Sequence, residues 1–204
     1  MRRLFGRLAV IPLVLTLAGC EGLDFDSESD RYREDFHYSY PLPATGTVQV
    51  ANRNGSIEIS GWDKNEIEID GTKHASSQSR LHEIKIDVNT SASSVTVRTV
   101  PPPDRFGHYG VSYMIHVPRR ARLDRIASSN GSIRATNIEG DAFVRTSNGS
   151  VHATQLRGML DIQTTNGSVE LTDVSGDTTI HTSNGGIRGD VKKGGLEAKT
   201  RTEP

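Results

Sequence analysis

The chain has 204 residues, of which 24 are basic and 25 acidic, so its formal net charge at pH 7 is −1. This balance argues against a nucleic-acid-binding protein, because such proteins need a surplus of basic side chains to hold phosphates. The single cysteine excludes an internal disulfide bond, and the length is that of one ordinary domain.

The first residues have the pattern of a lipoprotein signal peptide. Three arginines within residues 1–7 precede an apolar segment, residues 8–17, that is too short for a mature transmembrane helix. The ending Leu-Ala-Gly-Cys resembles the lipobox of bacterial lipoproteins, which implies a lipid on Cys20. We therefore expect residues 1–19 to be a signal peptide and Cys20 to anchor the protein to a membrane of the bacterial cell envelope. An ordinary signal peptide stays open, as do the choice of membrane and leaflet and the choice between Sec and twin-arginine export.

Residues 20–35 are predicted to be the lipidated cysteine and an acidic tether. The stretch from Glu21 to Asp35 carries seven acidic and two basic side chains. Its apolar side chains are too few to offset the entropy lost on folding, and its charges repel one another. The folded domain is therefore predicted to span residues 36–204.

The first part of this domain alternates apolar and polar residues, as half-buried strands do. Strands are expected within residues 46–70, which include an Asn-Gly-Ser-Ile phrase at Asn54, and within residues 83–100 and 111–118. The stretch from Pro101 is expected to be a loop, because proline cannot join a sheet interior. The next such phrase follows 76 residues after Asn54, which is not a multiple of eighteen, so insertions are expected to interrupt the stacking of the repeat.

From residue 130 the sequence repeats every eighteen residues. Four units begin with Asn-Gly at Asn130, Asn148, Asn166 and Asn184, and glycine recurs at every ninth position. Each half-unit is a turn followed by a short segment of strict alternation, which favours a strand over a helix. The sequence therefore predicts an all-β fold, a β-solenoid (β-helix-like) with two short strands per 18-residue coil, regular over residues 130–201.

The Asn-Gly phrases are interpreted as structural corners. Asn-Gly supplies the positive φ angles that a two-residue type I′ reversal requires. Stacked coils would align the asparagines so that their amides hydrogen-bond along the stack. The predicted turn ladder consists of Asn54, Gly55, Asn130, Gly131, Asn148, Gly149, Asn166, Gly167, Asn184 and Gly185. A second column, Thr146, Thr164, Thr182 and Thr200, is expected to satisfy turn backbone from inside.

Between the buried positions lie two columns of polar residues that face outward on opposite sheets. One contains Arg134, His152, Glu170 and Arg188, and the other contains Arg145, Gln163, His181 and Lys199. The candidate binding surface is taken from the first column and the threonines beside it: Arg134, Thr136, His152, Thr154, Glu170 and Thr172. The alternative is that these side chains form an ordinary solvated face.

Sequence motifs of catalysis and cofactor binding are missing. The seven histidines show no metal-ligand spacing, and no regular aspartate accompanies the glycines as in calcium-binding β-rolls. There is no Gly-x-Ser-x-Gly phrase and no phosphate-binding loop. The sequence therefore predicts no catalytic residues, no metal and no cofactor, and a protein that is not an enzyme.

Three passages carry a family resemblance: the strand–turn–strand VQVANRNGSIEISGWDKNEIEI, the strand VSYMIHVP with the basic run leading to Asn130, and the NGSV array. In this order, over residues 36–202, they resemble the bacterial putative adhesin family, envelope proteins with a β-solenoid domain of largely undefined function. The resemblance implies a β-solenoid and supplies no catalytic residues.

The last unit departs from the repeat, with Gly186 in place of serine and Gly189 at a core position. It is interpreted as a cap that blunts the open edge; a truncated or partner-paired end is the alternative. The predicted function is a membrane-anchored envelope lipoprotein with a non-catalytic, adhesin-like binding domain for a protein or polysaccharide. The alternatives are an envelope-stress or signalling component that binds a membrane partner, and a carbohydrate-active β-helix enzyme.

Overall fold

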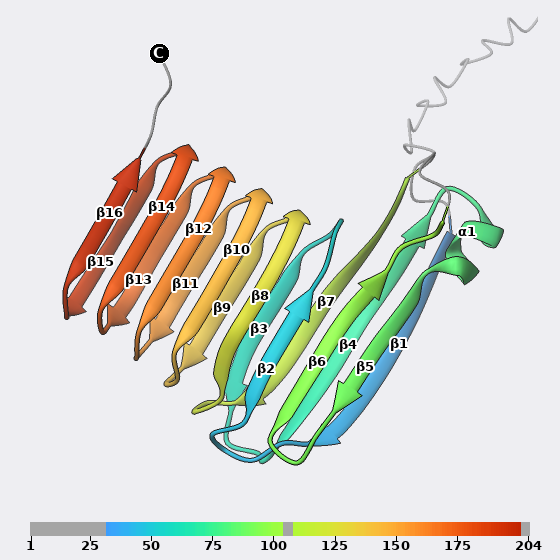
Figure 1. Ribbon diagram of the computed structural model, residues 1–204, viewed down its shortest axis with the longest axis horizontal. Coiled ribbons are helices and arrows are strands. Elements are labelled where there is room, and N and C mark those ends of the chain that lie inside the picture. Colours follow the sequence, from blue (N-terminus) through green and yellow to red (C-terminus); the bar gives the residue numbers. More distant parts are fainter. Residues whose placement is uncertain (1–31, 104–107, 201–204) are drawn as a thin grey trace, which may run out of the picture.

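The computed structural model describes residues 32–103 and 108–200. The predicted signal peptide, Cys20 and residues 21–31 of the predicted tether lie outside the described residues. Within the described part the fold is all-β, with two eight-stranded sheets packed face to face, as Figure 1 shows. No helix in these two ranges has the length and apolar character needed to cross a lipid bilayer.

In both sheets the strands of the C-terminal repeat lie at one end and strands from the N-terminal half lie at the other. The first sheet runs in the order β15 (Ile187–Lys193), β13 (Val169–Ser175), β11 (Val151–Leu156), β9 (Ile133–Ile138), β3 (Ile57–Trp62), β7 (Tyr109–Pro118), β4 (Glu66–Ala75) and β1 (Tyr32–Pro41). The second runs β16 (Leu196–Thr200), β14 (Thr178–Asn184), β12 (Leu160–Asn166), β10 (Ala142–Asn148), β8 (Arg122–Asn130), β2 (Thr47–Ala51), β6 (Ser94–Val100) and β5 (Lys85–Thr90).

In the repeat region, consecutive strands belong alternately to the first and the second sheet. Each pairs in parallel with the strand eighteen residues away, so that Val151 lies beside Val169 and Leu160 beside Thr178. This register holds along β10, β12 and β14 and along β9 and β11, because these units repeat the same pattern of turns and side chains. It shifts within the last pair of the first sheet, where Val174 lies beside Val191. The arrangement is a β-solenoid-like stack of parallel strands.

The core lies between the sheets. Buried residues alternate with outward ones along β10, β12 and β14, whereas in β9, β11 and β13 the alternation breaks before the third buried residue, at Ile138, Leu156 and Val174. The buried side chains are small or medium in size, such as Val151, Ala153 and Ile162, each at most 1% exposed. Burial of apolar surface, at about 25 cal/mol per Å², is the main favourable term that holds the sheets together. Larger side chains, among them Phe36 and Tyr113, occupy the N-terminal end of the core.

The expected interruption between Asn54 and Asn130 is wrong. Strand β3 pairs with β9, Ile57 beside Ile133, and Asn54 forms a parallel bridge with Asn130 although 76 residues separate them. The extra strands of this segment, β4 to β7, do not come between these two coils. They extend both sheets on the far side of β3 and β2, where β4 and β5 introduce antiparallel pairing.

The predicted boundary of the acidic tether is also wrong. Residues 32–35 belong to β1, which pairs antiparallel with β4 along its whole length. Their charges are compatible with a strand because β1 is an edge strand whose partners compensate them: Lys73 Nζ lies 2.7 Å from Glu34 Oε1, and the Thr72 hydroxyl donates to Asp35 at 2.6 Å. Pairing with a neighbouring strand therefore supplies the stabilisation that the few apolar side chains of this segment cannot provide.

One helix was not expected. The six-residue α1 (Gln78–Glu83) follows β4 and begins at Ser77, whose hydroxyl accepts a hydrogen bond from the backbone N–H of Arg80 at 3.3 Å. Leu81 packs into the core and is 2% exposed. A helix of this length gives no readable periodicity, so the sequence pattern does not reveal it.

Candidate functional site

The predicted turn ladder lies along one edge of the stack. The Nδ2 group of each asparagine donates to the Oδ1 atom of the one before it, from Asn184 through Asn166, Asn148 and Asn130 to Asn54, at 2.8–2.9 Å. Asn54 continues the row by donating to the carbonyl of Tyr109 at 3.2 Å. Each exposed amide therefore satisfies its neighbour, which suits a structural role at the corners.

The expected reason for the glycines at these corners is wrong. Gly131, Gly149, Gly167 and Gly185 do not have a positive φ, and only Gly55 of the ladder does, at 114°. A Cβ atom on Gly149 would lie 2.2 Å from the carbonyl oxygen of Gly131, and the other three glycines are equally crowded by backbone. Glycine is required here because adjacent coils approach too closely for any side chain.

The threonine column binds the same corners from inside. Thr146, Thr164 and Thr182 are each at most 6% exposed, and their hydroxyls donate to the carbonyls of Gly131, Gly149 and Gly167 at 3.1–3.2 Å. Ser128 takes the equivalent position and donates to the carbonyl of Gly55 at 3.2 Å. Thr200, the last member of the predicted column, is exposed.

The structure brings the six residues of the predicted binding surface together on the outer face of the first sheet. Arg134, His152 and Glu170 lie side by side in register, and so do Thr136, Thr154 and Thr172. The charges partly neutralise one another, since His152 Nδ1 lies 3.2 Å from Glu170 Oε2. This surface is therefore a mixed-charge face.

A groove with a volume of about 900 Å³ lies on the opposite sheet. It follows the outer face of the second sheet across β2, β8, β10, β12, β14 and β16, beside the asparagine corners. A register-aligned row forms its length: Ala51, Ala127, Arg145, Gln163, His181 and Lys199. Beside it runs a row of hydroxyls, Ser129, Ser147, Thr165 and Ser183.

The groove is positive in character. Among the described residues that line it, four are basic or imidazole side chains, namely Arg125, Arg145, His181 and Lys199, and none is Asp or Glu. Arg125 and Arg145 have no ion-pair partner among the described side chains. Lys199 is held by Glu197 at 2.5 Å, so its charge is compensated locally.

Sequence reasoning found only part of this site. The row from Arg145 to Lys199 was identified as outward-facing, but it was not chosen as the candidate surface. The contributions of Arg125, Ala51 and Asn52 were missed, because β8 and β2 precede the regular repeat. A useful signal is present in the sequence: the row is basic or neutral in every unit, whereas the row of Arg134 changes sign.

Chemically, the arrangement offers one row of basic or amide groups and one of hydroxyls, each repeated once per coil. Such rows can donate many weak hydrogen bonds along a line, which suits an elongated ligand more than a compact one.

The chain is similar to one described protein family and to several solved structures. A family model described as Toastrack DUF4097 matches residues 44–202. A solved structure of a putative cell adhesion protein from Clostridium sporogenes is 10% identical, with 83% of this chain and 100% of that one covered and a TM-score of 0.49. A putative adhesin from Bacteroides fragilis is 11% identical, with coverage of 82% and 94% and a TM-score of 0.40. A putative lipid binding protein from Parabacteroides distasonis is 8% identical, with coverage of 83% and 97% and a TM-score of 0.27. No curated protein matches the chain.

Proposed function

The chain belongs to the Toastrack DUF4097 family, and from this premise we propose that it is a non-catalytic binding protein of the bacterial cell envelope. The expected resemblance to the putative adhesin family is confirmed. In this proposal a lipid on Cys20 anchors the protein to a membrane. The folded domain is a β-solenoid with two short strands per coil, which holds a ligand away from the membrane surface.

The recurring eighteen-residue register supports this description of the solenoid. Strand partners in the repeat are separated by eighteen residues in both sheets, as for Ala153 beside Leu171 and Ile162 beside Ile180. Two strands per eighteen residues leave only short turns between them, so successive coils present the same positions at a spacing of about 4.8 Å.

The observation that carries the proposal is the groove on the second sheet, which has basic side chains and no described carboxylate along its length. It crosses six strands, which corresponds to roughly 24 Å at the usual strand spacing. A ligand that fits is an extended polymer with regularly placed anionic and hydroxyl groups, such as an acidic polysaccharide. The mixed-charge surface around Arg134 is the second candidate, and it has no such preference for one sign of charge.

The test is binding of the full chain to an acidic and a neutral polysaccharide, with polygalacturonate and dextran as probes. We expect retention on polygalacturonate that weakens with salt, because exposed charge contacts are screened. Arg125→Ala and Arg145→Ala should each weaken binding several-fold. Arg134→Ala removes the same charge from the opposite sheet and serves as the matched control. Equal retention on dextran, or an equal loss in the control, would refute the groove as the binding site.

Anchoring is tested separately by fractionation of the producing cells. Wild-type protein should sediment with membranes, whereas Cys20→Ser should release it, because the acyl chains supply the membrane affinity. Deletion of residues 21–31 should leave the anchor intact. If intact lipoprotein captures a membrane protein and this deletion abolishes the capture, the envelope-stress alternative is favoured over polymer binding.

A further inference from the structure

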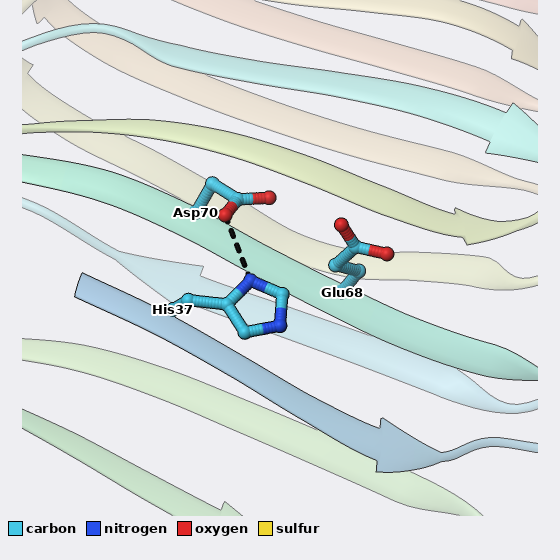
Figure 2. A group of neighbouring side chains, drawn as sticks. All are labelled: His37, Glu68 and Asp70. Carbon is cyan, nitrogen blue, oxygen red and sulfur yellow. Dashed lines mark hydrogen bonds and ion pairs between the residues drawn. The ribbon is translucent and has the colours of Figure 1, made fainter. Parts of the chain in front are cut away.

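We propose that His37, Glu68 and Asp70 form a binding site for a divalent transition-metal ion, such as Zn²⁺, on the outer face of the first sheet. His37 lies in β1 and the two carboxylates lie in β4. The antiparallel register sets His37 directly opposite Asp70, and Glu68 is two residues from Asp70 on the same face. Figure 2 shows the three side chains gathered over these two neighbouring strands.

The geometry is close to that of a metal site. His37 Nδ1 lies 2.8 Å from Asp70 Oδ1, and one ligand atom from each of the three residues lies within 4.8 Å of the others. A zinc ion about 2 Å from each ligand atom requires pairwise separations of no more than about 4 Å. The backbone of both strands is fixed by pairing, so the proposal requires that rotation of the side chains alone brings the three ligand atoms this close.

The partners of the other carboxylates on β1 and β4 distinguish these three residues from their neighbours. Three other carboxylates on the same two strands have partners: Glu34 with Lys73, Asp35 with Thr72, and Glu66 with Lys64. Glu68 has no hydrogen-bond or ion-pair partner among the described residues, and it lies beside the negative charge of Asp70. Two carboxylates and one neutral imidazole match a divalent cation in charge and in the ligand types that such ions accept.

The present contact between His37 and Asp70 is an exposed ion pair, so a metal ion has to compete with a proton. Hydrogen bonding to Asp70 raises the pKa of His37 above its ordinary value, and the negative charge of Glu68 acts in the same direction. Metal binding needs the neutral imidazole.

Strand β4 is the only described strand that pairs with β1, and beyond it His116 of β7 lies opposite Glu68. The ring of His116 stacks on Trp62 with centroids 5.1 Å apart.

A bound ion would cross-link the edge strand β1 to β4. Metal should therefore also raise the temperature at which the protein unfolds.

Calorimetric titration with zinc chloride tests the site. The full chain with Cys20→Ser is used as the reference, because the only thiol of the protein would otherwise offer a ligand. We expect one equivalent of Zn²⁺ to bind at pH 8. His37→Gln, Glu68→Gln and Asp70→Asn should each weaken this binding by roughly tenfold or more. All three changes lie on an exposed strand face, and unchanged circular dichroism verifies folding.

His152→Gln is the matched control, because His152 also lies opposite a carboxylate on the same sheet but lacks a second one. This variant should bind Zn²⁺ as the reference does. The proposal is overturned if the reference does not bind, if any of the three site variants binds as tightly as the reference, or if the control loses binding equally. This test measures neither polysaccharide binding nor membrane anchoring, so its result does not decide whether the proposed function is correct.

Discussion

At the scale of the residue, Tyr113 carries a hydroxyl into an apolar core and finds a partner there. Its side chain is 2% exposed, and its hydroxyl lies 2.6 Å from that of Thr99 on the opposite sheet. Thr99 donates to Asn52 Oδ1 at 2.9 Å, so Tyr113 is the donor to Thr99. Asn52 in turn donates to the carbonyl of Val111 at 2.7 Å. This chain of hydrogen bonds joins the two sheets without leaving a buried polar group unpaired.

Tyr113 should make stability depend on alkaline pH. Burial raises its pKa from 10.0 to about 12, so the folded protein holds the proton after the unfolded chain has lost it. The contribution of the neutral hydroxyl is fully present below pH 10.0 and is lost as pH rises toward about 12. The free-energy difference between wild type and Tyr113→Phe, from urea unfolding, should therefore shrink over this interval.

Ultraviolet titration gives an independent check of the same prediction. The wild-type protein should show a tyrosine component that ionises near pH 12, and Tyr113→Phe should lack it. A wild-type titration that the substitution leaves unchanged at high pH would contradict the assignment.

At the scale of the element, positions in the corners tolerate fewer types of residue than positions in the strands do. The asparagine and threonine columns tie every corner to the next through side chains, and the glycines allow backbone to lie against backbone. Strand positions, by contrast, accept Val, Ile, Leu, Ala or Thr at equivalent inward sites, because only size and apolarity matter there.

Gly149→Ala should destabilise the protein by about 3 kcal/mol, near the upper end of the cost of overpacking. The added Cβ would meet the backbone of Gly131, which cannot move without breaking the strand pairing on either side. Gly186→Ala is the control, because nothing lies within 4 Å of its Cβ position. That substitution should change the free energy of unfolding by less than about 0.5 kcal/mol.

Equilibrium unfolding in urea measures both variants. Similar stability for the two alanine variants would mean that the corners do not pack as tightly as the structure indicates.

At the scale of the whole molecule, the stack has two unlike ends (Figure 1). The N-terminal end is closed by antiparallel strands, the helix α1 and aromatic side chains. At the C-terminal end of the described residues, β15 and β16 each have one neighbouring strand, and Leu196, which belongs to the apolar column of Leu160 and Thr178, is 52% exposed. In a solenoid each coil contacts only its neighbours, so stability should decrease toward this end.

Hydrogen exchange should reveal this gradient. Amides of β15 and β16 are expected to exchange first among the repeat strands, and those of β9 to β12 last, because the latter have a buried inner face and paired neighbours on both sides. Mass spectrometry of peptides from each coil measures the order. Uniform protection along the repeat would indicate a cooperative unit or a partner that covers the last coil.

The sequence by itself determined the strands of the repeat, their register and the columns that share a face. This was possible because a period of two within strands and of eighteen between coils fixes which side chains meet, as for Asn130 and Asn148. A pairing such as Asn54 with Asn130, across 76 residues, has no such local signal.

Only the tertiary structure decided the rest. The inserted strands extend the sheets, residues 32–35 join β1, and His37 meets Asp70 from 33 residues away, because strand pairing between distant segments leaves no local trace in the sequence. The full extent of the groove was also decided by the tertiary structure, since part of its lining comes from β8 and from the end of β2, which precede the regular repeat. The role of the corner glycines was decided by the distance between coils, which depends on the stacked fold as a whole.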